Sequence, residues 1–177
     1  MWSALLCLFA IIAAAPDSKA ASAREIDGRV HETLDRFFYK IGGARELADK
    51  AVGILVFPSV VKAGFGIGGE YGEGALLIRG RPVGYYNTVS ASIGFQLGVQ
   101  ERSVIIAFMT PQALDQFRRT AGWKVGADAS VAIITVGVGG SIDTNKITSP
   151  VVGFILDPKG LMYNLTLEGS KISRINP

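Results

Sequence analysis

The sequence has a single cysteine, Cys7, and a single histidine, His31. One cysteine cannot form a disulfide within the chain, and a zinc site needs several cysteine, histidine or acidic ligands at suitable spacing. Catalysis by a Ser-His-Asp or Cys-His arrangement would have to use His31 alone. We therefore expect a chain with no metal site, no cofactor and no catalytic residue, and we predict that it is not an enzyme.

Charged residues are also scarce, at 19% of the 177 residues against 49% hydrophobic ones, with a formal net charge of +3. This composition predicts one domain with a real core and excludes a disordered chain. The basic residues are scattered in runs of at most two, so a nucleic-acid partner is not expected. The small positive excess fits an anionic membrane surface, and it equally fits an ordinary basic soluble protein.

Residues 2–15 form an apolar block, WSALLCLFAIIAAA, followed by PDSKAASA. The block is shorter than the roughly 20 residues that a membrane-spanning helix needs. Together with the small residues Ala21-Ser22-Ala23 it predicts a signal peptide over residues 1–23, cleaved before Arg24, and a mature domain over residues 24–177. We therefore expect export to the periplasm or envelope, with a retained N-terminal anchor as the alternative.

Residues 24–51 are predicted to be helical, with a break at Gly42-Gly43 before a short second helix. Basic and acidic residues nearly balance on the polar side of the first helix, so we favour packing on a sheet over lying on a membrane. The apolar residues fall three or four positions apart, which makes one stripe of Ile26, Val30, Leu34, Phe37 and Ile41.

Residues 53–109 alternate apolar runs with glycines and short polar breaks, which is typical of antiparallel strands joined by tight turns. Pro58 predicts an edge strand or a bend, because proline cannot donate to a strand ladder. The segments GEYGEG, residues 69–74, and Gly80-Arg81-Pro82 are interpreted as turns. Glycines inside the strands indicate that another backbone approaches closely or that the strands curve sharply.

A further helix is predicted over residues 111–120, because Thr110 is a good N-cap and Pro111 suits the first helical position. Strands are expected from Trp123 onward, with a closing hairpin that turns at Pro158-Lys159-Gly160 and a last short strand, KISRI. With about eight strands in all, the fold class is α+β. We expect a strongly bent antiparallel sheet or barrel with an N-terminal amphipathic helix and a second helix near residues 111–120.

Three motifs invite functional interpretations. The segment starting at Gly64 satisfies G-x-G-x-x-G, but no helix pattern follows it, so a dinucleotide site is rejected. Glu70 and Glu73 are interpreted as solvated acids of a turn rather than as a catalytic pair. Asp128 lies between apolar segments, and we favour a role in capping a turn over one in catalysis.

Several segments in series resemble the SYLF domain family: AVGILVFPSVVKAGFGIGGEYGEGALLIRG, YYNTVSASIGFQLGVQ, TPQALDQF, WKVGADASVA and LTLEGSKISRI. The resemblance extends from about Lys50 to Asn176 and implies lipid binding, with phosphoinositides and other anionic lipids as ligands of eukaryotic members. It implies actin or actin-regulator binding for fungal members, and no catalytic residue. Many members carry a Trp-Ser-Xaa-Pro-like segment where Tyr85 and Tyr86 supply the aromatic rings here.

For an exported bacterial protein the resemblance implies non-enzymatic binding of anionic phospholipids, or of a membrane surface, at the envelope. For such an exported protein the resemblance leaves the protein partner unknown. An envelope structural or protein-interaction module without lipid preference is the alternative, and a hydrolase using Glu70, Glu73 or Asp128 is a third hypothesis. The residues expected to contact lipid are Lys62, Arg79, Arg81, Tyr85, Tyr86, Phe37 and Phe38.

Overall fold

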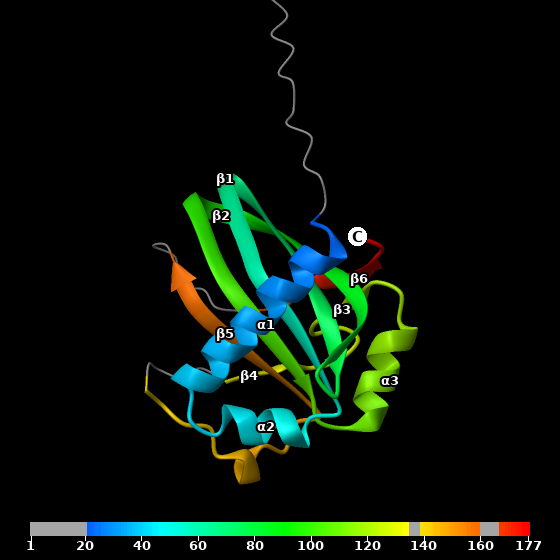
Figure 1. Cartoon of the computed structure of the whole chain (residues 1–177). Helices are drawn as coiled ribbons and strands as arrows, with labels where there is room; N and C mark the ends of the chain where they lie inside the picture. The colour runs from blue at the N-terminus through cyan, green and yellow to red at the C-terminus, as the bar shows by residue number, and fades with distance from the viewer. Residues whose placement is uncertain (1–20, 135–138, 160–166) are drawn as a thin grey trace, which may run out of the picture.

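A computed structural model describes residues 21–134, 139–159 and 167–177, with backbone alone at residues 65, 66, 92–97 and 159 (Figure 1). Most of the predicted signal peptide, the Gly160 end of the last predicted turn and most of the strand after it lie outside these residues. The helices are α1 (Ala23–Lys40), α2 (Ala44–Lys50) and α3 (Pro111–Arg119), with a 3-10 turn η1 (Thr144–Lys146). The strands are β1 (Gly53–Ile78), β2 (Arg81–Phe108), β3 (Trp123–Lys124), β4 (Ala132–Ile134), β5 (Val151–Lys159) and β6 (Lys171–Ile175).

The fold is built around one long hairpin. β1 and β2 pair antiparallel from Ile78 and Arg81 at the turn to Gly53 and Phe108 at the open end. The turn places Arg79 at φ 51° and Gly80 at φ 73°, and two left-handed residues match the twist of a hairpin. Figure 1 shows both strands running side by side and bending back midway along their length, near the labels β1 and β2.

The curl brings the two halves of β1 face to face, and Gly74 lies where they meet. A Cβ at position 74 would overlap the carbonyl oxygen of Val56. The segment GEYGEG is therefore strand and not the turn that its glycines predicted, because those glycines serve a close backbone approach. Pro58 lies where the register of β1 with β2 shifts, between Phe57 and Val60, which agrees with the predicted bend.

The other strands continue the sheet from the opposite edge of β2. β6 pairs with the first half of β2, and β5 pairs with its second half, both antiparallel. β3 adds to β6, whereas β4 adds to β5 in the parallel direction. The described residues thus form a six-stranded sheet in the order β3-β6-β2-β5-β4, with β1 beside β2. The strongly bent sheet of an α+β fold is confirmed, with fewer and longer strands than expected.

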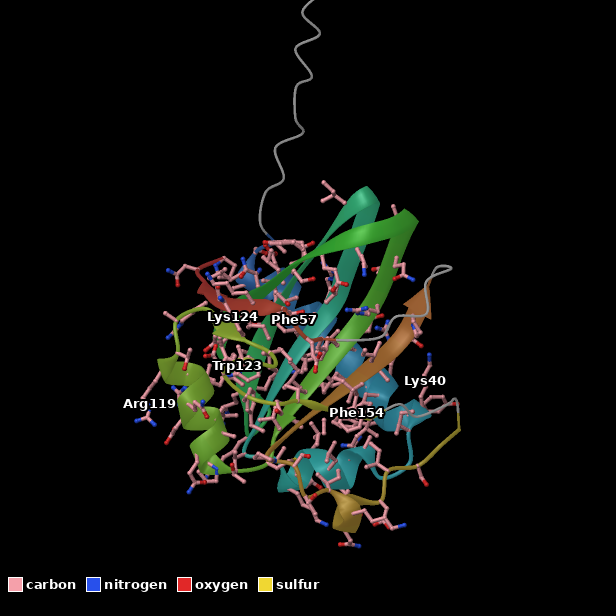
Figure 2. The ribbon with its side chains drawn as sticks, turned by 180° about the vertical axis from the view of Figure 1, so that it is seen from behind. Lys40, Phe57, Arg119, Trp123, Lys124 and Phe154 are labelled. Carbon is pink, nitrogen blue, oxygen red and sulfur yellow. The ribbon has the colours of Figure 1, made fainter. Side chains whose placement is uncertain are left out.

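Alternate residues along the strands divide the core into two clusters, as the two-residue period of a strand requires. Val56 and Ile105 face α1 and α2, together with Phe154 of β5. Phe57 and its neighbours on the other face pack against α3 and Trp123. Figure 2 shows Phe154 in the first cluster, and Phe57 and Trp123 in the second.

Local signals are confirmed around α3. Thr110 caps the helix, with its side chain accepting a hydrogen bond from the Ala113 N–H, and Pro111 opens it. Asp128 accepts the Lys124 N–H over 2.6 Å through Oδ2, which is the turn-capping role that was favoured. The G-x-G-x-x-G segment lies inside β1, so it opens no helix.

Candidate functional site

Helix α1 lies across the sheet and forms one wall of the candidate site. It begins after Ser22, whose Oγ accepts the Glu25 N–H over 3.4 Å. Its apolar stripe is buried against the sheet, and the ring of Phe37 lies 5.1 Å from that of Phe154. The favoured interpretation of this helix, packing on the sheet, is confirmed.

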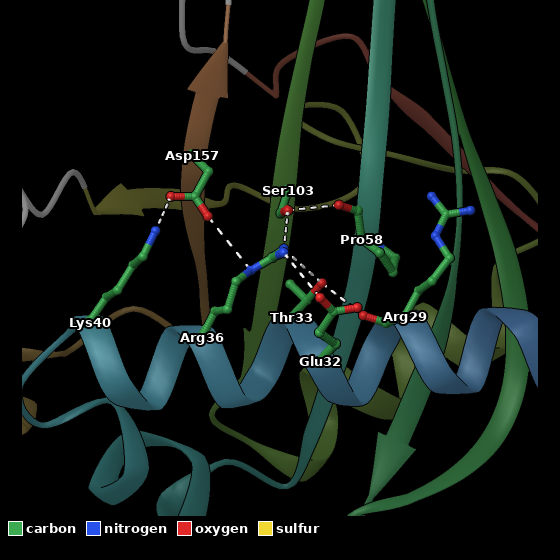
Figure 3. A network of polar contacts seen from close by, with 8 residues as sticks. All are labelled: Arg29, Glu32, Thr33, Arg36, Lys40, Pro58, Ser103 and Asp157. Carbon is green, nitrogen blue, oxygen red and sulfur yellow. Dashed lines mark hydrogen bonds and ion pairs between the residues drawn. The ribbon is translucent and has the colours of Figure 1, made fainter.

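The polar side of α1 borders a cavity of about 570 Å³. The opposite wall comes from Pro58 and Ser59 of β1, Ser103 of β2, and Asp157 of β5. Figure 3 shows α1 running along this cavity with its side chains reaching toward the strands. The α1 residues that line it are Arg29, Glu32, Thr33, Arg36 and Lys40.

Asp157 is the carboxylate that holds two of these cations. Lys40 Nζ donates to Asp157 Oδ1 over 2.5 Å, and Arg36 Nε lies 3.7 Å from Asp157 Oδ2 (Figure 3). The Asp157 backbone has φ 49°, a left-handed conformation that is uncommon for a non-glycine residue. One carboxylate is thus shared between two positive side chains.

Arg36 is also oriented by hydroxyl groups. Its Nη2 donates to Thr33 Oγ1 over 3.3 Å and to Ser103 Oγ over 3.4 Å. Ser103 Oγ in turn donates to the Pro58 carbonyl over 2.7 Å, so the guanidinium group is tied to the bend in β1. The buried Arg36 Nε has no hydrogen-bond partner among the described residues. Among the residues that the structure describes, Arg29 has no carboxylate within ion-pair distance.

A second cavity, of about 840 Å³, adjoins the first and shares Arg29, Pro58 and Ser59 with it. Its walls are more apolar, and they include Val61 and Val89, which are 40% and 45% exposed. We call the two cavities together the α1 groove. The end that we call cationic carries Arg29, Arg36 and Lys40 and also the carboxylates of Glu32, Glu101 and Asp157, whereas the other end is more apolar. A ligand with a charged head and a hydrocarbon chain matches this division.

The chain enters the apolar end of the α1 groove at Ala21. The Ala21 N–H donates to Glu73 Oε2 over 3.1 Å, and Tyr71 donates its hydroxyl hydrogen to Glu73 Oε1 over 2.6 Å. Burial raises the pKa of Tyr71, and the hydrogen bond and negative charge of Glu73 raise it further. Glu73 therefore fastens the start of α1 to the curled hairpin.

The residues predicted to contact lipid do not form one surface. Phe37, Tyr86 and Lys62 are buried, at 1%, 6% and 8% exposed. Lys62 Nζ lies 3.5 Å from Glu70 Oε1 inside the curled hairpin. Glu70 is therefore a buried, paired acid and not the solvated turn residue that was expected.

The remaining predicted residues lie nearer the surface. Phe38 and Arg79 line a separate cavity of about 450 Å³, where the Arg45 guanidinium lies 4.6 Å from the Phe38 ring centre. Arg81 is exposed beside the hairpin turn. Tyr85 donates its hydroxyl hydrogen to the Asp27 carboxylate over 3.1 Å.

The sequence reasoning missed the cationic end of the α1 groove. Arg29, Arg36 and Lys40 are spaced seven and four residues apart, which places them on one face of a helix. That spacing was available as a signal. The partner of two of them, Asp157, lies 117 residues away from Lys40, and no local pattern points to it.

Two further properties of the described residues bear on the site. No helix among them combines the length and apolar character needed to cross a membrane. The same residues hold no cluster of three or more histidine, cysteine or acidic side chains suited to a metal ion.

These features define an α+β domain whose curled sheet and N-terminal helix enclose an amphipathic groove. The model of the Ysc84 family, described as Las17-binding protein actin regulator, matches residues 89–176. Through these residues the chain belongs to the Ysc84, or SYLF, family, which confirms the resemblance seen in the sequence. The family is one of actin-regulating and lipid-binding domains. No curated protein matches the chain.

Proposed function

We propose that this chain binds anionic phospholipids without catalysing a reaction, in the bacterial periplasm or envelope. The observation that supports this most directly is the α1 groove, where a cavity bordered by Arg29, Arg36 and Lys40 adjoins a more apolar one. Phosphate oxygens accept charge-assisted hydrogen bonds from arginine and lysine, and an acyl chain gains free energy by leaving water for an apolar wall. The lipid-binding character of the family supports the same proposal.

Arg29, Arg36 and Lys40 are the groups proposed to meet the lipid phosphate. Arg36 is already oriented by two hydroxyl groups, and its Nε is not hydrogen-bonded in the described residues. Side chains held in place lose little conformational entropy on binding. Val61 and Val89 would contact the hydrocarbon part. The location outside the cytoplasm is supported by the apolar block at residues 2–15 and the small residues after it.

The test is co-sedimentation of residues 21–177, which keep the Ser22 cap and the Ala21 contact of the α1 groove, with anionic and neutral vesicles at low and high salt. Binding should favour anionic vesicles and weaken with salt, because the Debye length falls from about 10 Å at 0.1 M to about 3 Å at 1 M. The double variant Arg29→Gln/Arg36→Gln should lose affinity roughly 30-fold, since each cation near an anionic surface contributes about 1 kcal/mol.

Lys50→Gln/Lys146→Gln is the matched control, because it removes the same charge at exposed positions outside the α1 groove. Equal loss in both double variants would reduce the effect to net charge and contradict a defined site. Equal binding to neutral vesicles would contradict the anionic preference. No binding to either vesicle would overturn the proposal in favour of a protein-interaction module.

A further inference from the structure

A second basic pocket lies on the α3 side of the molecule, away from the α1 groove. It has a volume of about 470 Å³. Figure 2 shows Arg119 and Lys124 on this side and Lys40 on the opposite side of the same view. We call it the α3 pocket. It is lined by Tyr86, Arg118, Arg119, Thr120, Ala121, Gly122, Lys171, Ser173 and Arg174, with no acidic side chain among them.

The packing of α3 determines where Arg118 and Arg119, in its last turn, leave the helix. Phe117 is buried, and its ring centre lies 4.9 Å from that of Tyr86 and 5.4 Å from that of Trp123. Because the helix is anchored by this residue, Arg118 and Arg119 leave its last turn at a defined place. A helix C-terminus favours positive charge, which accounts for these two residues without a ligand.

The helix dipole does not account for the cations on β6. Arg174 pairs in register with Tyr86 of β2, and Lys171 pairs with Lys124 of β3. Like charges directly opposite each other on neighbouring strands destabilise a sheet. The fold thus brings cations from α3 and β6 into one pocket, and it places Lys124 of β3 opposite Lys171 at a cost in stability.

None of Arg118, Arg119, Lys171 and Arg174 has a carboxylate within 4.0 Å among the described residues. In contrast, Lys40, Lys50 and Lys62 each have one. The α3 pocket is therefore a concentration of positive charge that the protein itself does not neutralise. Such a concentration attracts an anion and binds it by charge-assisted hydrogen bonds.

Two neighbours shape the α3 pocket. A Cβ at Gly122 would overlap Cε of Lys171, so the lysine side chain lies across this glycine, whose φ is +66°. Burial raises the pKa of the Tyr86 hydroxyl, while Arg174 and Arg118 lower it. The hydroxyl therefore lies within the electrostatic influence of both arginines.

We propose that the α3 pocket binds a phosphate group with a charge close to −2, as a phosphomonoester carries. Several converging cations suit such a group better than a single-charge carboxylate. The phosphate can belong to a lipid headgroup or to a soluble compound, and the chemistry of recognition is the same. The site does not use the α1 groove, so it goes beyond the function proposed above.

The experiment measures how residues 21–177, which keep the Ser22 cap of α1, bind two probes. The soluble probe is inorganic phosphate. Its binding is measured as a rise in the thermal unfolding temperature relative to sodium chloride at the same ionic strength. The lipid probe is phosphatidylcholine vesicles containing phosphatidic acid. Co-sedimentation with them is measured in the Arg29→Gln/Arg36→Gln background, where the α1 groove contributes little. Lys171→Gln/Arg174→Gln should bind each probe at least about tenfold more weakly than the protein with both cations, because the variant lacks two charge-assisted contacts at exposed positions.

Two control variants keep the result specific. Lys50→Gln/Lys146→Gln removes the same net charge elsewhere and should bind like the wild type. Arg29→Gln/Arg36→Gln should keep the stabilisation by inorganic phosphate although it weakens binding to anionic vesicles, so that failure of the α1 groove and failure of the α3 pocket are separate results. Loss with phosphatidic acid vesicles alone assigns the site to a lipid headgroup, and loss with both probes assigns it to phosphate in general. Equal binding by Lys171→Gln/Arg174→Gln and the wild type, or no saturable binding of either probe, would overturn the proposal.

Discussion

Arg102 donates a hydrogen bond from Nη2 to Oε2 of Glu70 over 2.8 Å, and both side chains are buried inside the curled hairpin. Glu70 also faces Lys62, so one carboxylate balances two buried cations. Removing a partner from a buried pair leaves an uncompensated charge, which costs far more than losing a surface pair.

We therefore predict that Glu70→Gln lowers the free energy of unfolding by about 3–5 kcal/mol. Urea unfolding followed by circular dichroism measures the loss. Glu32→Gln is the control, because its pair with Arg36 spans 3.8 Å and is largely exposed, and it should cost about 1 kcal/mol or less. A similar small loss in both variants would contradict the role given to Glu70.

The contact of Gly74 with the Val56 backbone predicts a second stability effect. Gly74→Ala should destabilise the protein by about 3 kcal/mol or more, because a methyl group there overlaps a carbonyl that the strand cannot easily move. Gly28→Ala is the matched control, since a Cβ in the middle of α1 meets nothing within 4 Å. It should instead stabilise by about 0.5–1 kcal/mol through helix propensity. Thermal unfolding of the two variants distinguishes these opposite signs.

Asp157 competes with any anion for Arg36 and Lys40. We predict that Asp157→Asn strengthens binding to anionic vesicles roughly fivefold, since about 1 kcal/mol accompanies each unit of charge near an anionic surface. Asparagine tolerates the left-handed backbone at this position. Asp143→Asn is the control, because Asp143 pairs with Lys146 at η1, outside the α1 groove. Equal strengthening in both variants would show that net charge alone is responsible.

The tyrosine hydroxyls predict a loss of stability in alkali. Burial raises the pKa of Tyr85, and its hydrogen bond to Asp27 and the negative charge of Asp27 raise it further from 10.0. A pKa raised by folding gives a stability that is fully present below the unfolded-state pKa and is lost as pH rises through the folded-state value. Urea unfolding between about pH 9 and 11 should therefore show falling stability.

Tyr85→Phe should make that fall shallower, because the variant lacks one hydroxyl that ionises more easily in the unfolded chain. Tyr39→Phe is the control, since Tyr39 is 91% exposed. An identical pH dependence in wild type and Tyr85→Phe would show that the Asp27 contact has no effect on stability.

Sequence patterns predicted the elements whose causes are local. Thr110 and Pro111 start α3 by capping and by a preset φ, and the apolar stripe of α1 follows from helical spacing alone. The family resemblance was also visible in short motifs, although the matching family model begins at Val89 and does not extend to β1. These features need only a few neighbouring residues to be recognised.

The sequence did not reveal the features that depend on the curl of the hairpin. Gly74 was interpreted as part of a turn, because nothing nearby in sequence shows that its partner is Val56. Lys62 was predicted to contact lipid, although the fold buries it beside Glu70. Long-range packing overrides local propensity in such places.

The antiparallel pairing of β1 with β2 along their whole length also determines which fragments of this domain keep their strand partners. A fragment of residues 89–176 would keep the second half of β2 but lose the strand that pairs with it, because Val104 to Phe108 align with Phe57 to Gly53. It would also lose most of the β2 segment that pairs with β6. Such a fragment would expose an open sheet edge that invites pairing with other chains. The boundary of the family match therefore falls inside one paired sheet, and we expect that residues 89–176 alone do not fold into the same structure.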